Sequence, residues 1–163
     1  MPSERQPKPD FLKTHSFKKS FNIQAPIKAC WDYLNNMDTF RNGQIFPYRV
    51  EFIHFSKSPS FEPGIWTNHH GPLLSVCGQI GQMTPPSYRD LNYTYGSYVI
   101  SFRYIRPVRL QLFFSSKTES KTQIDVQLDA YIVPWLIPIW EGIQRLFWTG
   151  FGWSISRHLR KSF

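Results

Sequence analysis

The sequence predicts an α+β domain in which a curved antiparallel sheet of about seven strands wraps around a long C-terminal helix, with two short helices after the first strand. Three observations support this prediction. An alternating segment at residues 16–23 leads into a segment of helical period, alternating segments fill most of residues 47–130, and the helical period returns from residue 136. A curved antiparallel sheet has one face that needs a cover, which the last helix can provide.

The first strand is predicted at residues 16–23, where phenylalanine and isoleucine side chains alternate with polar ones. Pro26 suits the first position of a helix, because its missing N–H group would have no partner there in any case. Apolar residues then follow at helical spacing, at Ile27, Cys30, Trp31 and Leu34. Residues 37–40 predict a second short helix.

About six further strands are predicted from the alternation of apolar and polar residues. They are expected at residues 48–55, 65–70, 74–80, 90–95, 108–114 and 124–130. In the fourth of these, Tyr93 and Tyr95 are expected to face inward with Leu91. The last two form the clearest hairpin in the chain, and the phase of residues 96–107 is left unassigned.

The C-terminal helix is predicted from Leu136 to about Lys161. Its apolar stripe is expected to consist of Trp140, Ile143, Phe147, Phe151, Ile155 and Leu159. Trp148 and Trp153 fall outside this stripe. Exposed aromatic side chains beside basic ones on such a helix are typical of contact with an anionic membrane surface.

Length and composition indicate one domain. The chain has 163 residues and a formal net charge of +8. We expect a flexible N-terminal arm at residues 1–14 and a single domain at residues 15–163. The charge favours anionic partners, or is simply a solvated basic surface. Two cysteines form no disulfide framework, and the N-terminus has no apolar signal segment, so a cytoplasmic protein is expected.

The order and spacing of these segments resemble the SRPBCC superfamily of helix-grip proteins, which includes START domains, pollen-allergen-like proteins and polyketide cyclases. The resemblance runs from about Ser16 to Lys161. The matching landmarks are Phe21-Asn22-Ile23-Gln24-Ala25-Pro26 leading into Ala29-Cys30-Trp31-Asp32-Tyr33-Leu34, then Phe46-Pro47, Pro63-Gly64, Thr84-Pro85-Pro86 and Thr122-Gln123-Ile124. The resemblance implies a helix-grip fold with a deep cavity between the sheet and the last helix.

Members of this superfamily bind lipids, sterols, quinones, polyketides or plant hormones, and some catalyse cyclisation or dehydration. The superfamily has no universal catalytic residue, so no catalytic residue is transferred to this chain. The residues expected to line the cavity are Phe52, His54, Tyr93, Tyr95, Leu112, Phe114, Val126, Trp140, Ile143 and Phe147. A tyrosine hydroxyl on an apolar body suits the orientation of one oxygen atom of a hydrophobic ligand.

Other chemistries find no support in the sequence. His69 and His70 are adjacent in a predicted strand and point to opposite faces, so they cannot bind one metal ion together. Neither a nucleophile-elbow motif nor a phosphate-binding loop is present. The acidic residues of the strands take the outward phase, which favours ligand binding over acid–base chemistry. We therefore expect no metal ion and no cofactor.

Three hypotheses follow. The first is a protein that binds a hydrophobic small molecule (a lipid, quinone, sterol or polyketide-like compound) without catalysis. The second is an enzyme of polyketide cyclase or dehydrase type, in which cavity tyrosines or His54 move protons. The third is a lipid- or quinone-handling protein similar to the coenzyme Q-binding branch, in peripheral contact with an anionic membrane. No specific nucleic-acid partner is expected, because no recognition motif accompanies the charge.

Overall fold

The computed structural model describes residues 6–44, 46–53, 58–98, 101 and 103–160. Its helices are α1 (Ile27–Leu34), α2 (Met37–Asn42), the short 3₁₀ helix η1 (Pro134–Leu136) and α3 (Ile137–Leu159). Its strands are β1 (Lys13–Ile23), β2 (Arg49–Ile53), β3 (Trp66–Gly71), β4 (Leu74–Thr84), β5 (Tyr88–Tyr98), β6 (Ile105–Thr118) and β7 (Lys121–Ile132).

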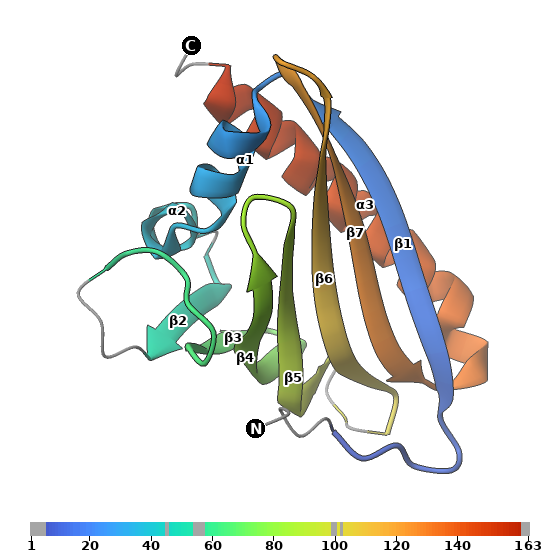
Figure 1. Ribbon diagram of the computed structural model, residues 1–163. Helices are drawn as coiled ribbons and strands as arrows, with labels where there is room; N and C mark the ends of the chain where they lie inside the picture. The colour runs from blue at the N-terminus through green and yellow to red at the C-terminus, as the bar shows by residue number, and fades with distance from the viewer. Residues whose placement is uncertain (1–5, 45, 54–57, 99–100, 102, 161–163) are drawn as a thin grey trace.

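The strands form one antiparallel sheet in the order β1-β7-β6-β5-β4-β3-β2. Helices α1 and α2 connect the two edge strands, and α3 runs beside β1 along the length of the sheet (Figure 1). This arrangement confirms the α+β helix-grip prediction.

The junction between β1 and α1 is fixed by a side chain from the far end of the sequence. The hydroxyl of Thr122, buried at the start of β7, donates a hydrogen bond of 2.8 Å to the carbonyl oxygen of Ala25. Asn36 caps the N-terminus of α2, since its side-chain oxygen accepts a hydrogen bond from the N–H group of Asp38 at 2.8 Å. These bonds satisfy groups that helix ends and turns otherwise leave unpaired.

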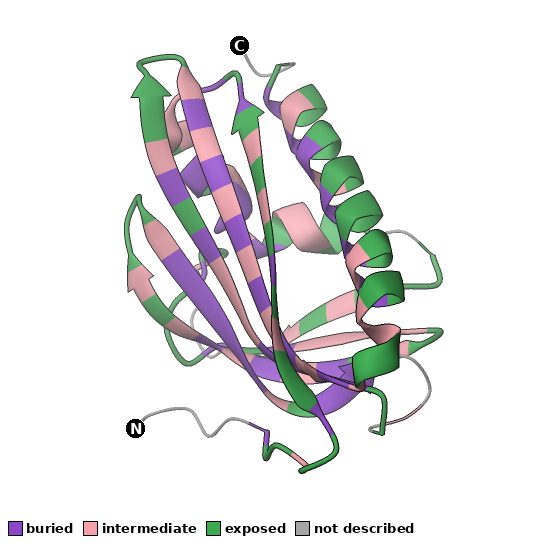
Figure 2. Cartoon of the chain, turned by 90° about the vertical axis from the view of Figure 1, so that its right-hand side faces the viewer, coloured by how far each residue is buried: buried purple, intermediate pink, exposed green. Residues whose placement is uncertain are grey.

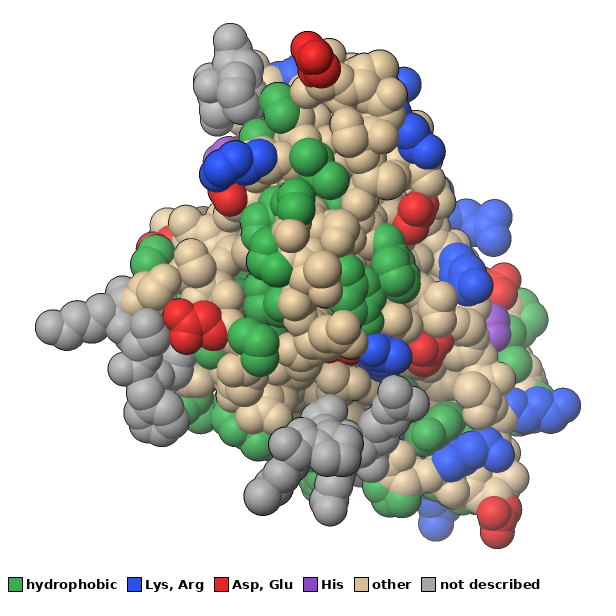
Figure 3. Space-filling model, in the orientation of Figure 1, with side chains coloured by type: hydrophobic (Ala, Val, Ile, Leu, Met, Phe, Trp, Pro, Cys, Tyr) green, Lys and Arg blue, Asp and Glu red, His purple; other side chains and the backbone are tan. Residues whose placement is uncertain are grey.

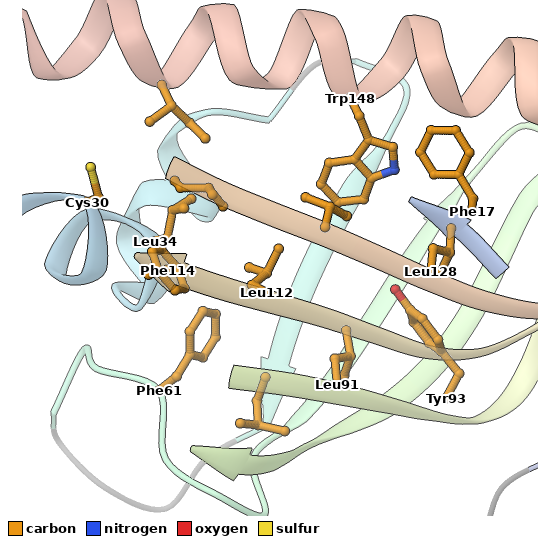
Figure 4. Packing of buried hydrophobic residues seen from close by; sticks show 14 of the residues in the cluster. Phe17, Cys30, Leu34, Phe61, Leu91, Tyr93, Leu112, Phe114, Leu128 and Trp148 are labelled. Atoms are coloured by element: carbon orange, nitrogen blue, oxygen red, sulfur yellow. The ribbon is translucent and has the colours of Figure 1, made fainter. Parts of the chain in front are cut away.

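The core lies between α3 and the sheet, and β7 contributes to it at every second residue. The inward-facing residues of β7 are all buried, namely Thr122, Ile124, Val126, Leu128, Ala130 and Ile132. Figure 4 shows Trp148 reaching down from α3 toward Phe17 and Leu128. Strand β7 pairs antiparallel with β6, which confirms the predicted hairpin.

The rotation of α3 about its axis differs from the prediction. Its buried residues are Trp140, Gln144, Trp148, Gly152, Ile155 and Leu159. Ile143 and Phe147 are 56% and 58% exposed, so the prediction that they face inward is wrong. The outer side of α3 is exposed along the helix (Figure 2).

Close packing at one glycine explains this rotation. A Cβ atom on Gly152 would lie 3.1 Å from Cγ of Phe21 in β1, so the helix approaches the strand where a side chain is absent. One turn earlier, Trp148 points inward and its indole N–H donates to Oε1 of Gln144 at 3.1 Å. Because α3 carries apolar residues on both sides, its period alone does not determine which side is buried.

A β-bulge in β5 reverses the predicted orientation of Tyr95. Cys77 of β4 pairs with Tyr95, whereas the next residue, Gly78, pairs with Tyr93. Thr94 is therefore an extra residue in β5, which moves Tyr95 to the opposite face of the sheet. Tyr93 is 2% exposed and Tyr95 is 66% exposed, so the prediction that Tyr95 faces inward is wrong.

Part of the predicted N-terminal arm contacts the domain. The side-chain amide of Gln6 donates to the carbonyl oxygen of Pro107 at 2.9 Å, and both Gln6 and Leu12 are buried. Strand β1 begins at Lys13, slightly before the predicted domain boundary. The flexibility of residues 1–14 stays a prediction, and residues 1–5 lie outside the described residues.

Candidate functional site

The candidate site is a small pocket between α2 and strands β2–β6, on the face of the sheet that the helices cover. Its apolar lining consists of Phe40, Val50, Phe52, Phe61, Ile80, Leu91, Leu110 and Leu112, and its polar lining consists of Thr67, His69, Arg89 and Asp90. The volume of the cavity is about 50 Å³. That volume corresponds to roughly three to five water molecules.

Three phenylalanine rings form an aromatic side of the pocket. The ring centroids of Phe52 and Phe61 are 5.2 Å apart, and those of Phe40 and Phe61 are 5.7 Å apart. The segment before β3 is tied to the α1–α2 connection, since the N–H group of Phe61 donates to the carbonyl oxygen of Asn35 at 2.8 Å. Phe40 and Phe61 therefore lie on neighbouring segments at the helical side of the pocket.

Arg89 of β5 is a buried cation in this aromatic environment. It is 7% exposed, and its guanidinium carbon lies 4.7 Å from the ring centroid of Phe61 and 6.0 Å from that of Phe40. Burial lowers the pKa of Arg89 to about 10. Among the described residues, no hydrogen bond or ion pair reaches its guanidinium, so cation–π contacts are its main electrostatic support.

His69 and Tyr93 place neutral polar groups near Arg89. A ring nitrogen of His69 lies 3.0 Å from the hydroxyl oxygen of Thr67, and the His69 and Tyr93 rings are 6.2 Å apart. Burial lowers the pKa of His69 to about 4, helped by the positive charges of Arg89 and His70. Burial also raises the pKa of Tyr93 well above its ordinary value. At neutral pH both groups act as uncharged hydrogen-bonding partners.

The carboxylate of Asp90 belongs to the opposite face of the sheet, although the residue borders the pocket. It accepts from the Arg109 Nε–H group at 2.9 Å, from the Tyr88 hydroxyl at 3.1 Å and from the backbone N–H group of Gln82 at 2.7 Å. Tyr88 and Asp90 alternate with Arg89 along β5, so their side chains point away from the pocket. Asp90 is thus neutralised without contact with Arg89.

The residues predicted from the sequence to line the cavity are widely separated. Phe52 and Leu112 line the pocket, and Tyr93 contacts His69 beside it. Phe114 packs against Trp31, Trp140 packs against Tyr98, and Val126 is buried in the core. Tyr95, Ile143 and Phe147 are exposed and are not part of the lining of this pocket, and their outward direction follows from the bulge in β5 and the rotation of α3. His54 lies outside the described residues.

The sequence interpretation missed Arg89, Phe40 and Phe61, and it did not decide between His69 and His70 as a polar group of the cavity. For Arg89 a signal was present, because it alternates in phase with Leu91 and Tyr93 and so places a charge on the inward face. His69 shares a face with Thr67 in the same way. Phe61 lies in a connecting segment, where no periodicity indicates its direction.

The described residues contain neither a cluster of metal ligands nor a membrane-spanning helix. In that part of the chain, no three His, Cys, Asp or Glu side chains gather closely enough to hold a metal ion. None of its helices has both the length and the apolar character that crossing a membrane requires.

No protein-family model and no curated protein matches the chain. Solved structures do match it. A START superfamily protein from Mycobacterium smegmatis has a TM-score of 0.68 at 7% identity, over 91% of this chain and 99% of that one. Norcoclaurine synthase from Thalictrum flavum, in complex with dopamine and hydroxybenzaldehyde, has a TM-score of 0.66 at 10% identity, over 93% and 89%.

A conserved protein from Geobacillus kaustophilus is similar to the same degree. Its TM-score is 0.68 at 13% identity, over 91% of this chain and 97% of that one. These similarities extend over nearly the whole chain and support the SRPBCC resemblance at the level of the fold. At such identities they show the fold alone.

Proposed function

We propose that this protein binds a hydrophobic small molecule in the pocket between α2 and the sheet. The observation that carries the proposal is a mainly apolar, aromatic pocket with a few convergent polar groups, the usual composition of a small-molecule site. START-like structural neighbours support it as well. Burial of apolar ligand surface supplies most of the affinity, at roughly 25 cal/mol per Å² before the costs of ordering.

A ligand larger than a few water molecules needs more room, which a movement of this aromatic side would provide. The ring of Phe61 contacts both Phe52 and Phe40. Phe40 lies on α2, a helix of only 6 residues, and Phe61 lies in a connecting segment. Rotation of these two side chains, or displacement of α2, enlarges the pocket without breaking a pairing between strands.

The test is a titration with Nile red, a neutral dye that fluoresces in apolar surroundings. Val50→Trp fills the pocket from β2, and Ile53→Trp adds the same ring to an exposed position of the same strand. We expect Val50→Trp to weaken binding about tenfold or more and Ile53→Trp to leave it within about twofold. Equal affinities in the two variants, or no binding by the unsubstituted protein, would contradict the proposal.

An enzyme of cyclase or dehydrase type is the alternative function. The neighbouring His69, Thr67 and Tyr93 side chains favour it, because they offer hydrogen bonds to a polar atom of a bound substrate. The low pKa of His69 makes it a weak base. This alternative predicts that Tyr93→Phe abolishes turnover of a polyketide substrate while binding persists.

Peripheral contact with an anionic membrane is a second proposal, carried by the outer side of α3. Its exposed apolar residues are Ile139, Ile143, Leu146, Phe147 and Trp153. The guanidinium of Arg157 lies 5.3 Å from the Trp153 ring centroid, and Arg145 and Arg160 are exposed nearby on the helix. Such a surface suits the interface between acyl chains and anionic headgroups.

Co-sedimentation with phosphatidylcholine vesicles, with and without phosphatidylserine, tests this second proposal. Binding should require the anionic lipid and should be lost in Leu146→Glu. Binding that does not depend on lipid charge, or a dimer that forms through this surface instead, would contradict it.

On the face of the molecule shown in Figure 3, basic side chains are interspersed with acidic ones. The absence of a specific nucleic-acid partner stays a prediction.

A further inference from the structure

We propose that Arg89 is an anion-recognition group and that the ligand of this pocket is a small apolar carboxylic acid, bound as its carboxylate. This inference rests on the proposed binding function and makes its ligand class specific. It is carried by a buried guanidinium that lines an apolar pocket without a carboxylate partner among the described residues.

The acidic residues on the elements around the pocket are engaged elsewhere or exposed. Glu51 pairs with His70 at 3.6 Å, and Asp38 pairs with Arg41 at 3.4 Å. Asp90 pairs with Arg109 on the other face of the sheet, and Glu62 is exposed. Burying a charge without an opposite charge is energetically costly, and a ligand carboxylate would offset that cost.

The aromatic contacts of Arg89 favour a particular binding geometry. The face of a guanidinium stacks on aromatic rings, whereas its N–H groups point outward from its edge. Phe61 and Phe40 contact the guanidinium of Arg89. We therefore expect a ligand to bind to the N–H groups on the edge of the guanidinium. A carboxylate matches this edge with two parallel hydrogen bonds.

The remaining lining limits the rest of the ligand. Phe52, Leu91 and Leu112 offer apolar surface, and Thr67 with neutral His69 offers one or two uncharged hydrogen bonds. No second described cation lines the pocket, which favours a single negative charge over a phosphate. An aromatic acid and a short aliphatic acid share this chemistry.

The experiment is an NMR titration of the full chain with phenylacetate and with phenylacetamide, its neutral analogue of nearly equal size. Octanoate and octanamide form the aliphatic arm. The variants are Arg89→Met, which removes the charge, and Arg89→Lys, which keeps the charge but not the planar fork. Arg49→Met is the control, because Arg49 is exposed on β2 and lies outside the pocket lining.

We expect the unsubstituted protein to prefer each carboxylate over its amide by about tenfold or more, as for hydrogen bonds to charged groups. Arg89→Met should remove this preference and leave amide affinity within about twofold. Arg89→Lys should retain part of it, and Arg49→Met all of it. The arm with the tighter carboxylate identifies the aromatic or the aliphatic class.

The outcomes separate this inference from the binding proposal. Equal affinities for carboxylate and amide, or a carboxylate preference that survives in Arg89→Met, would overturn the anion inference while binding itself stands. If neither member of either pair binds and Nile red does not bind, the binding proposal fails together with it. A preference lost equally in Arg49→Met would assign the effect to surface charge and would also overturn the inference.

Discussion

The guanidinium carbon of Arg89 lies 4.7 Å from the ring centroid of Phe61, which joins the middle of the sheet to the segment that precedes β3. The contact places a permanent charge where a hydrophobic-ligand protein would be expected to have only apolar and neutral groups. Its stabilisation, about 0.5–2 kcal/mol for a cation–π pair, is smaller than the cost of burying the charge. The unliganded protein therefore retains a net electrostatic penalty at this position.

Arg89→Met should consequently raise the stability of the protein without ligand. We expect the free energy of unfolding to increase by about 1 kcal/mol, because methionine fills similar space without a charge to desolvate. Urea denaturation at pH 7 measures the change, with Arg49→Met expected within about 0.5 kcal/mol of the parent. A loss of stability in Arg89→Met would instead identify the guanidinium as a structural group.

His69 should make stability depend on pH. Its pKa is about 4 in the folded protein and 6.5 in the unfolded chain, so the unfolded chain binds the proton first as pH falls. Stability is therefore lost as pH falls from about 6.5 to about 4, by about 1–3 kcal/mol from this residue. The positive charges that act on it are those of Arg89 and, from the other face of β3, His70, and the ring of Tyr93 packs beside it.

The comparison of the parent with His69→Gln isolates this contribution from that of the carboxylates. Glutamine keeps a hydrogen-bonding group near Thr67 but does not titrate. Urea denaturation at pH 7 and at pH 4.5 should show a smaller loss in the variant. Equal losses in both proteins would mean that His69 takes up its proton in the folded state as readily as in the unfolded chain.

Two glycines of α3 should respond to substitution in opposite directions. A Cβ atom on Gly150 meets nothing within 4 Å, so Gly150→Ala should stabilise the helix by about 0.5–1 kcal/mol. Gly152 packs against Phe21, so Gly152→Leu should destabilise the protein by about 1–3 kcal/mol through overpacking. Thermal denaturation of both variants checks the rotation of α3, and the reverse order would contradict it.

Tyr93 and Tyr95 should also differ, because the bulge at Thr94 separates them. Tyr93→Ala removes a buried ring and should cost about 3–5 kcal/mol. Tyr95→Ala removes an exposed ring and should cost about 1 kcal/mol or less. Urea denaturation measures both, and similar losses would argue against the observed register of β4 and β5.

The strand pattern was predictable where the alternation is uninterrupted. In β7 every second residue from Thr122 to Ile132 is buried, as the sequence predicts for a sheet with one covered face. In β5 the same reasoning holds up to Tyr93 and fails after it. A bulge shifts the phase by one residue, and its signals in the sequence are glycines within strands: Gly78 lies at the shift in register, and Gly96 has a φ of 120°.

The candidate site was less predictable than the fold. The inward direction of Arg89 could be derived from its phase, but its lack of a carboxylate partner depends on where Asp90 and Glu51 lie in space. The aromatic side of the pocket depends on Phe61, whose position follows from a backbone hydrogen bond to Asn35 in the α1–α2 connection. The exposed side of α3 also carries apolar residues, so its composition could not predict which side of the helix faces the sheet.

The pairing of β1 with β7 constrains the order in which the protein can fold during synthesis. Ile23 pairs with Thr122 and Lys13 pairs with Ile132, so roughly a hundred residues are made between the two strands. At about 5–20 residues per second, β1 leaves the ribosome several seconds before its partner exists. During that interval Phe17 and Phe21 have neither β7 nor α3 to cover them, and the nascent chain is most open to chaperones.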